Sequence, residues 1–484
     1  MNELQVFFTN YWPHLAFVLG LTIGGTAAVH AAMTKNDVRA AIGWVGVIIM
    51  SPLLGPLIYL VVGINRIRHD QISELRNRAL HDYGPAFSEQ PFELSDHAGQ
   101  QFEALEVLGD RISRFPLCTG NAIVRLRGGD EAYPAMLAAI DGAQRTVALQ
   151  TYIFDHDRIG VQFAEALARA HARGVHVRVL IDAVGSRYSR PPIIRLLRHH
   201  GVPSALFMTN PLGMRMPYAN LRSHRKILVI DGQDSFTGGM NIREGFVHAL
   251  AGERTALDTH FHVTGPVVRQ IMSVFAQDWM FTTNESLPLQ IWCNDDPVHQ
   301  PQNMPARSIR SGPDRQLAAT QSMLLGAFAV AQKHIRIQSP YFLPDQVLMG
   351  AINTAARRGV KVDILIPGSN NLRLVNYAMT AQLDQVIRAG CQVWRGRGNF
   401  DHSKLTTIDG TWCYIGSSNM DPRSLRLNFE LDVEVYSRTL TAQIDEDMDA
   451  AISQATPVTL QDLARLPFRK RLRNRIIWLA SPYL

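Results

Sequence analysis

The chain begins with two long apolar runs and continues with shorter segments in which apolar and polar residues alternate. Residues 13–33 and 40–64 contain no Asp, Glu, Lys or Arg, and each run is long enough to cross about 30 Å of hydrocarbon. The two runs predict a transmembrane helical hairpin within residues 1–68. Four residues that bend or end helices interrupt the second run: Ser51, Pro52, Gly55 and Pro56. We therefore expect a kink or a re-entrant break there.

A cleaved signal peptide and a pair of buried core helices are the alternatives to this membrane anchor. A signal peptide needs a basic stretch before its apolar run, but Glu3 is the only charge before residue 13. Core helices of soluble proteins rarely continue for more than about twenty residues without a charge. Lys35 and Arg39 lie between the runs, and further arginines follow the second run: Arg66, Arg68, Arg76 and Arg78. This excess of positive charge predicts that the large domain is cytoplasmic.

The rest of the chain contains an internal repeat of strand and helix patterns. A strand, a helix and a second strand are expected twice, over 145–154, 159–174 and 175–182, and again over 334–342, 344–359 and 360–367. The second helix is expected to start at Pro344. Gln150 in the first half matches Gln338 in the second. The pattern predicts a mixed α/β sheet flanked by helices in each half.

A second repeat carries the residues with the clearest chemistry. The spacing H-x-K-x4-D is found twice with a constant offset (402 − 224 = 178), in His224, Lys226 and Asp231 and again in His402, Lys404 and Asp409. Each copy continues into a turn of small residues that ends in asparagine, GGMN with Asn241 and GSSN with Asn419. The shared offset argues against a chance origin of the motif.

Alternate side chains of an extended segment share a face, so the histidine and lysine of each motif should point into one site. Histidine can attack phosphorus, and protonated histidine can donate to a leaving alkoxide. Two histidines in one site could divide these roles, while lysine and asparagine donors bind the phosphoryl oxygens without a metal ion. The motif also makes Asp231 and Asp409 candidate catalytic residues. Their odd separation from the histidines places them on the opposite face, so we expect them to anchor the turns after the strands.

A catalytic histidine also needs an acidic group that fixes its tautomer and orientation. Glu430 in NFELDVEVY and Asp258 in LDTHFHVTG lie on the strand patterns that follow the two asparagines. A charge on a solvent-facing strand edge is the alternative for both. We take Glu430 and Asp258 as candidate histidine-orienting residues, and Asn241, Ser417 and Asn419 as candidate phosphate-binding residues.

Composition narrows the class of ligand. The 484-residue chain carries a net charge of +6 at pH 7, which favours an anionic partner such as a nucleic acid or an anionic membrane surface. The four cysteines are too scattered for a disulfide framework or a paired metal motif. No cluster of His, Cys and carboxylates has the spacing of metal ligands. We therefore predict that the chemistry uses neither a metal nor another cofactor.

The paired motifs with their G-[GS]-x-N tails resemble those of the phospholipase D superfamily. The phrases GSSNMDPRSLRLNFE, NLRSHRK and FTGGMN, with the paired apolar runs, resemble its bacterial cardiolipin synthase branch over nearly the whole chain. The resemblance implies two pseudo-twofold-related α/β/α lobes, and a covalent phosphohistidine intermediate formed by His224 with His402 as general acid and then base. It implies transfer of a phosphatidyl group from one phosphatidylglycerol to another, with release of glycerol, at the bacterial cytoplasmic (inner) membrane.

On this basis the chain is divided into a hairpin anchor, a stalk or connector, two phospholipase D-like lobes and a basic amphipathic tail. Their expected bounds are 1–68, 69–104, 105–290, 300–456 and 457–484. The tail combines basic residues with Trp478 and Tyr483, which suits an anionic lipid surface. A helix that packs its apolar residues on the domain is the alternative for the tail.

Three other functions share the same motif. A phospholipase D would hydrolyse phospholipid to phosphatidic acid through the same intermediate, and it is the strongest rival. A nuclease would suit the positive charge but would not need two apolar runs, so we predict an anionic phospholipid partner and no nucleic acid. An inactive scaffold is disfavoured because both His-Lys pairs are intact. The sequence makes no prediction about oligomeric state.

Overall fold

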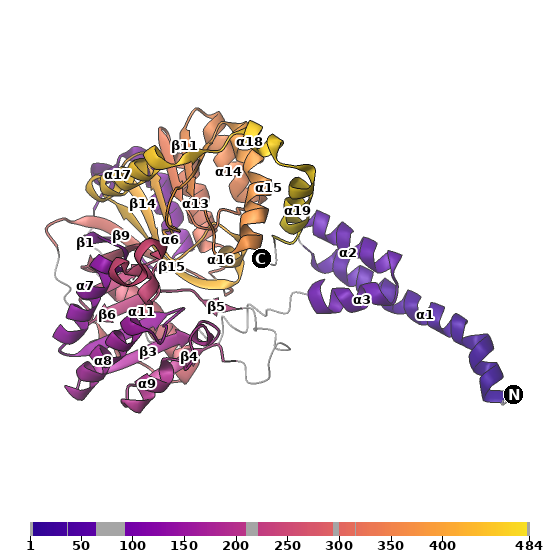
Figure 1. Cartoon of the computed structure of the whole chain (residues 1–484), viewed down its shortest axis with the longest axis horizontal. Helices are drawn as coiled ribbons and strands as arrows, with labels where there is room; N and C mark the ends of the chain where they lie inside the picture. Colours follow the sequence, from indigo (N-terminus) through magenta and orange to yellow (C-terminus); the bar gives the residue numbers. More distant parts are fainter. Residues whose placement is uncertain are drawn as a thin grey trace. The chain divides into compact units, whose positions relative to one another are not determined.

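A computed structural model of the chain describes residues 3–35, 37–63, 92–209, 221–293, 300–314 and 316–481 (Figure 1). The chain divides into two compact units, Met1–Arg68 and His69–Leu484. Residues 69–91 of the predicted stalk lie outside the described residues, and so does Tyr483 of the predicted tail.

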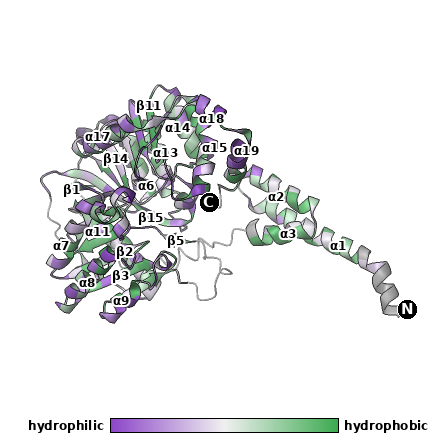
Figure 2. Cartoon of the chain, viewed as in Figure 1, coloured by the Kyte–Doolittle hydropathy of each residue, from purple (hydrophilic) through white to green (hydrophobic). Residues whose placement is uncertain are grey.

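The described part of the N-terminal unit consists of helices, and its residues are mostly hydrophobic (Figure 2). Helix α1 (Glu3–Thr34) includes His14–Thr34, the one segment in the described part of the chain that is long and apolar enough to span a membrane. The second apolar run forms α2 (Val38–Met50), α3 (Leu54–Ile58) and a π-helical turn, η1 (Tyr59–Gly63). The expected break is therefore present at residues 51–53, where Pro52 lacks a backbone N–H group. This run is not one continuous spanning helix.

The large unit is built around one mixed β-sheet. In the first half its strands are β1 (Cys118–Arg127), β2 (Thr146–Thr151), β3 (His176–Asp182), β4 (Ser204–Phe207), β5 (Arg222–Ser223), β6 (Ile227–Ile230), β7 (Asp234–Gly238) and β8 (Thr259–Thr264). In the second half they are β9 (Met304–Ser311), β10 (His334–Gln338), β11 (Lys361–Ile366), β12 (Gln392–Arg395), β13 (Leu405–Ile408), β14 (Trp412–Gly416), β15 (Asn428–Tyr436) and β16 (Thr456–Pro457).

The strand order shows the duplication directly. Among the described residues the order is β16-β12-β11-β10-β13-β14-β15-β9-β1-β8-β7-β6-β2-β3-β4. The two central strands are β9 and β1, and the order outward from them is equivalent in the two halves. On one side β1 is followed by β8, β7, β6, β2, β3 and β4. On the other side β9 is followed by their counterparts β15, β14, β13, β10, β11 and β12. The predicted pair of α/β lobes is confirmed. The antiparallel pairing of β1 with β9 joins both lobes into one sheet, which the sequence pattern did not indicate.

Helices cover both faces of the sheet in each lobe (Figure 1). One face carries α7 (Gly128–Gly142), α8 (Arg158–Ala172) and α9 (Ile194–His199) in the first lobe, and α13 (Ala319–Val330), α14 (Gln346–Arg357) and α15 (Arg373–Ala389) in the second. The other face carries α11 (Val267–Thr283) and α17 (Arg438–Gln454). Alternation along the strands explains both layers: Leu149 of β2 packs with α7 and α8, whereas its neighbour Gln150 donates a hydrogen bond to Asp278 of α11.

Shorter elements complete the large unit: α5 (Leu94–Ala98), η2 (Gln100–Phe102), α6 (Glu103–Ile112), η3 (Gly185–Arg187), η4 (Glu244–Phe246), α10 (His248–Ala251), η5 (Gly252–Arg254), α12 (Leu289–Trp292), α16 (Pro422–Arg426), α18 (Leu460–Arg465) and α19 (Phe468–Leu479). The predicted strands and helices of the repeat are all present. Helix α14 starts two residues after Pro344, because the Asp345 side chain caps it by accepting hydrogen bonds from the N–H groups of Val347 and Leu348.

Helix α6 packs on the second lobe, although it lies just before the first lobe in the sequence. Phe102 and Leu105 are fully buried in the hydrophobic core of the second lobe. Arg307 of β9 reaches from the sheet to α6, where it pairs with Asp110, and it also pairs with Glu434 of β15. At Gly109 a Cβ atom would lie 1.9 Å from the Arg307 guanidinium, so a larger residue here would displace the guanidinium from its present position.

Asp231 and Asp409 close the turns after β6 and β13. Asp231 accepts hydrogen bonds from the N–H groups of three consecutive residues, Gln144, Arg145 and Thr146, at 2.8–2.9 Å. Asp409 accepts three in the same way, from Gln332, Lys333 and His334 at 2.8 Å. Both aspartates have a positive φ, of 53° and 52°. Each holds the start of the neighbouring strand, β2 or β10, as expected for residues that anchor the turns, and the catalytic role that the motif suggests for them remains a prediction.

We predict that Asp231→Ala and Asp409→Ala lower stability far more than they lower catalysis. Each variant loses a charged acceptor of backbone N–H groups, at a cost of about 1.5–3 kcal/mol. Thermal unfolding in detergent should show a lowered Tm, while activity of the folded fraction at low temperature stays within about threefold. A loss in the general acid–base range, about 10²–10⁴-fold, in either variant at unchanged Tm would contradict the structural role.

Candidate active site

Each catalytic-motif histidine is held by the backbone of the opposite lobe. The short strand β5, which precedes His224, pairs in parallel with β15 of the second lobe. The His224 N–H group donates to the Phe429 carbonyl at 2.8 Å. In the same way the His402 N–H group donates to the Leu257 carbonyl of the first lobe at 2.7 Å. The two motif segments therefore cross between the lobes and meet at the junction.

Each histidine also forms a hydrogen bond with a carboxylate of the opposite lobe. Nδ1 of His224 lies 3.0 Å from Oε2 of Glu430, and Nδ1 of His402 lies 2.9 Å from Oδ2 of Asp258. Both carboxylate side chains are fully buried, so neither is the solvent-facing edge charge considered as an alternative. A carboxylate accepts a proton donor at Nδ1, which leaves the Nε2 lone pair of each neutral histidine free to face a substrate. The sequence identified both acids but not which histidine each one holds.

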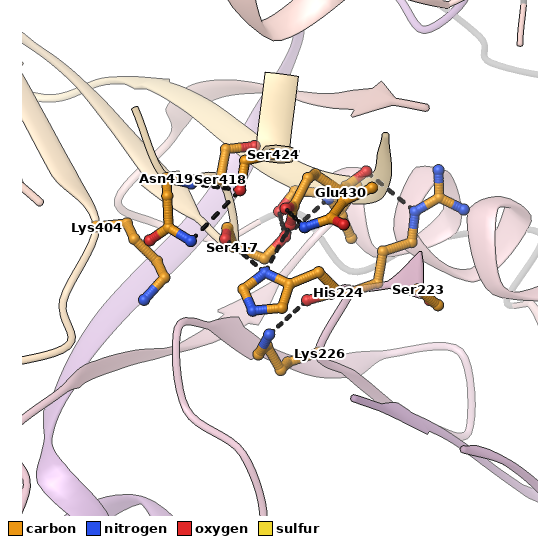
Figure 3. A network of polar contacts seen from close by, with 12 residues as sticks. Ser223, His224, Lys226, Lys404, Ser417, Ser418, Asn419, Ser424 and Glu430 are labelled. Atoms are coloured by element: carbon orange, nitrogen blue, oxygen red, sulfur yellow. Dashed lines mark hydrogen bonds and ion pairs between the residues drawn. The ribbon is translucent and has the colours of Figure 1, made fainter. Parts of the chain in front are cut away.

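The Ser417 side chain is hydrogen-bonded to Glu430, and the phosphate-binding role expected for it from the sequence remains a prediction. Its hydroxyl donates to Glu430 Oε2 at 2.6 Å, and Asn428 donates to the other carboxylate oxygen at 3.1 Å (Figure 3). At the offset of the repeat, Gly239 is the counterpart of Ser417. A Cβ atom at Gly239 would lie 2.5 Å from Asp258 Oδ1, so only glycine leaves room for Asp258.

These surroundings give the two carboxylates different acidities. Burial tends to raise the pKa of Glu430, but the charges of His224 and Lys226 and the hydrogen bonds from His224 and Ser417 outweigh it, so this pKa is lowered. Burial raises the pKa of Asp258 to about 6, with Lys404 opposing the shift. Both groups are carboxylates at neutral pH, and Asp258 is the first of the two to gain a proton as the pH falls.

The two lysines lie close to the histidines, and both are buried. Lys226 and Lys404 are 2% and 5% exposed, and the Nζ of each donates to the carbonyl of its own motif histidine. Figure 3 shows Lys404 and Asn419 of the second lobe beside His224 and Lys226 of the first. Burial lowers the pKa of Lys226 to about 7 and that of Lys404 to about 8, although nearby Glu430 and Asp258 oppose the shifts. The ammonium groups need an anionic ligand to stabilise their charge.

The pKa values of both histidines are also lowered by burial. Burial lowers the pKa of His224, with Glu430 opposing the shift. The pKa of His402 is lowered well below its ordinary value, first by burial and then by the charges of Lys404 and Lys226. Both imidazoles are therefore neutral at pH 7 while the site is empty. An anion bound between the lysines would raise both histidine pKa values and favour a protonated imidazole.

The two asparagines are each 5% exposed, and Asn419 belongs to the polar network of Figure 3. Asn241 Oδ1 accepts a hydrogen bond from the Ile153 N–H group at 3.1 Å, so the amide oxygen is oriented toward the protein. The Asn419 amide nitrogen lies 3.3 Å from the Ser424 hydroxyl, and its Oδ1 atom is buried without a partner in the described protein. An amide at this point can supply a hydrogen-bond donor to a phosphoryl oxygen.

Aromatic rings, which the sequence analysis did not single out, surround the histidines. The Tyr152 ring centroid lies 5.4 Å from that of His224. Tyr341, Phe400 and Phe246 surround His402 at centroid distances of 5.8–6.4 Å. This wall explains why burial is the largest influence on both histidine pKa values. Tyr152 and Tyr341 lie just after the matched glutamines, which was the signal available in the sequence.

A buried hydrogen bond holds the residue that immediately precedes each histidine. Gln150 donates to the Ser223 hydroxyl at 2.8 Å, and its counterpart Gln338 donates to Asp401 at 2.7 Å. Ser223 and Asp401 immediately precede His224 and His402, so the two glutamines have equivalent roles. Arg225 points away from His224 and pairs with Asp278 at 2.5 Å, while its Nε donates to the Glu430 carbonyl at 3.0 Å.

Comparisons with known proteins agree over the length of the chain. Residues 136–279 and 324–452 match the family described as "Cardiolipin synthase, PLD-like domain", and residues 26–63 match "Phospholipase D-nuclease N-terminal". Cardiolipin synthase A of Pseudomonas entomophila (strain L48) is 30% identical over 489 aligned residues, and that of Pseudomonas putida (strain GB-1) is 31% identical over 491. Both alignments cover 100% of this chain and 100% of the relative.

A solved structure supports the fold independently. The phosphatidylserine synthase of Haemophilus influenzae Rd KW20 aligns with a TM-score of 0.59 and 16% identity, over 80% of this chain and 100% of that chain. At this identity the likeness concerns the fold alone. The apolar helix α1 and the matched N-terminal family indicate membrane association. The matched domains and the full-length relatives together show that the chain belongs to the phospholipase D-like cardiolipin synthase family.

Proposed function

We propose that the protein is a membrane-anchored phosphatidyltransferase that forms cardiolipin from two phosphatidylglycerol molecules and releases glycerol. The observation that carries the proposal is the reciprocal site, in which each motif histidine is held by a buried carboxylate of the other lobe. Two oriented imidazoles between two lysines suit transfer of a phosphodiester group through a covalent intermediate. The full-length cardiolipin synthase relatives support the choice of lipid substrate.

In the first step, His224 Nε2 attacks the phosphorus of the donor phosphatidylglycerol. A phosphorus–nitrogen bond forms and the phosphorus–oxygen bond to the glycerol headgroup breaks. Glu430 stabilises the positive charge that develops on the His224 imidazole. His402, protonated because the bound phosphodiester raises its pKa, donates its proton to the leaving glycerol oxygen. Lys226, Lys404, Asn241 and Asn419 bind the phosphoryl oxygens.

In the second step, a hydroxyl of the acceptor phosphatidylglycerol attacks the same phosphorus. His402, now neutral, takes the hydroxyl proton, while Asp258 holds its imidazole in place. The new phosphorus–oxygen bond forms as the bond to His224 breaks, which regenerates both histidines. The aromatic wall limits the access of water, and this favours an alcohol over hydrolysis.

We also propose that the N-terminal segments pass through the bacterial cytoplasmic membrane more than once and leave the large unit in the cytoplasm. Helix α1 supplies one span. The second apolar run would complete the hairpin despite its break at residues 51–53, because a re-entrant segment can be satisfied within protein. The charge excess after the second run supports this orientation.

The direct test is turnover of labelled phosphatidylglycerol by the purified full-length protein in mixed micelles that contain EDTA. We expect cardiolipin and glycerol in equal amounts, and added glycerol should drive the reaction backward. Phosphatidic acid as the main product would instead establish hydrolysis. Loss of turnover in EDTA that one added divalent ion restores would contradict a reaction without a metal.

The division of labour between the histidines can be tested with a nitrophenyl ester of phosphatidic acid, whose leaving group needs little protonation. We expect His402→Ala to accumulate a phosphatidyl adduct on His224, because the acceptor is no longer deprotonated, and to lose about 10²–10⁴-fold in turnover of phosphatidylglycerol. His224→Ala should form no adduct. Mass spectrometry of peptides locates the adduct, and exposed His199→Ala serves as the control. An adduct on His402 in the His224→Ala protein would reverse the two roles.

The acidities of the site predict a bell-shaped dependence of kcat/KM on pH. Lys226, with its pKa lowered to about 7, loses its proton as the pH rises, and the rate should then fall roughly tenfold per pH unit. Asp258, with its pKa raised to about 6, gains a proton as the pH falls, and the acid limb should begin there. Lys226→Arg keeps its charge and should move the alkaline limb upward. An alkaline limb that stays in place in Lys226→Arg would show that another group causes it.

A further inference from the structure

Helix α19, the last helix of the described chain, is attached to the second lobe by one face only. Asn474 is 4% exposed, and Ile477 and Trp478 pack against the hydrophobic core of the second lobe. Arg473 lies over the Tyr377 ring of α15 at 3.6 Å, and Arg475 pairs with Asp384 of α15 at 3.3 Å. These contacts fix the rotation of α19 about its own axis, and therefore determine which residues its other face presents.

The side of α19 away from Asn474 and Ile477 carries an exposed apolar stripe, defined by Phe468, Leu472, Ile476 and Leu479; the first half of this stripe also borders α15 and α18. Their side chains are 69%, 47%, 58% and 72% exposed. At about 100° per residue the four positions fall within about 80° of one another on the helix surface. Large apolar side chains that are contiguous and exposed mark an interaction surface. The described residues do not bury this stripe.

Basic residues flank the stripe on both sides. Arg469 lies at one edge, and Arg475 and Arg471 lie at the other, with no acidic residue anywhere in α19. Among the described residues no carboxylate forms an ion pair with Arg469 or Arg471, whereas Arg475 is paired with Asp384. Figure 2 shows the strongly hydrophilic residues of this helix. An apolar stripe with cationic edges matches the boundary between acyl chains and anionic headgroups.

A cavity of about 430 Å³ between α15, α18 and α19 adds a second feature of the same kind. Phe468 and Leu472 of the stripe contribute apolar lining, and Arg388 and Arg471 contribute positive charge. The lining also includes one carboxylate, Asp384, which is paired with Arg475. The cavity therefore combines apolar walls with an excess of cationic groups, as a site for an anionic amphiphile does.

We propose that α19 binds the surface of an anionic phospholipid bilayer, with its apolar stripe inserted at the level of the headgroups and its flanking arginines on lipid phosphates. The contact concerns how the large unit meets the membrane and does not depend on the reaction proposed above. Four partly inserted apolar side chains, together with basic residues near an anionic surface, give a reversible contact that adds to the N-terminal anchor.

The test compares two faces of the same helix in the full-length protein, reconstituted in phosphatidylglycerol/phosphatidylcholine vesicles. A bimane fluorophore is attached at Leu472→Cys in the stripe or at Lys470→Cys on the far side of the helix, with Cys118→Ser in both proteins. The three remaining cysteines are buried. Nitroxide-bearing lipids quench fluorophores that lie in the bilayer, and iodide quenches those in water.

We expect nitroxide lipids to quench residue 472 at least twofold more than residue 470, with the reverse order for iodide. The difference should shrink in pure phosphatidylcholine and in Arg469→Gln/Arg471→Gln protein. Arg195→Gln/Arg198→Gln on α9 is the matched loss of charge and should leave it unchanged. Unfolding temperatures confirm that each variant is folded. Equal lipid quenching at the two positions overturns the proposal. So does protection of residue 472 from both quenchers, since the stripe would then be covered by protein, either the N-terminal unit or a second copy.

Discussion

The exchange of hydrogen bonds across the lobe junction is the constraint on which the rest of the structure depends. Glu430 of the second lobe holds His224 of the first, and Asp258 of the first lobe holds His402 of the second. The backbone N–H group of each histidine also donates to a carbonyl of the opposite lobe. Each lobe is complete as an α/β layer, but neither contains a histidine together with the acid that orients it. The shared sheet through β1 and β9 fixes the geometry of both pairs at once.

The two halves are nearly symmetric, but they differ in the hydrogen-bond donors that surround the two orienting carboxylates. Ser417 and Asn428 add two donors to Glu430, whereas Gly239 leaves Asp258 without an equivalent of the serine hydroxyl. The pKa of Glu430 is accordingly lowered and that of Asp258 is raised to about 6. A duplicated fold thus provides two imidazoles of similar position and different electrostatics. Burying two lysines beside them is unfavourable in the empty site and becomes favourable when a phosphodiester is present.

Local patterns in the sequence predicted the elements and most of the site. The period of two identified β2, β3, β10 and β11, and it placed Asp231 and Asp409 on the face away from the histidines. The constant offset of the repeat paired the two motifs. The pairing of each acid with the opposite histidine could not be read from the sequence, because it depends on contacts between segments 144 and 206 residues apart. The role of Ser417 and the packing of α6 on the second lobe depend on the same long-range contacts.

The reciprocal pairing also determines when the site can exist during synthesis. Glu430 is 206 residues later in the chain than His224, and strand β15, which carries it, is the last long strand of the described chain. A ribosome that has completed the first lobe has therefore produced His224 and Asp258 but the partner of neither, while α1 is already available for insertion into the membrane. Because domains fold largely as they emerge, the nascent chain is tethered to its lipid bilayer well before it can act on the lipids there. Premature termination anywhere before β15 leaves a fragment that lacks Glu430, the acid that orients His224.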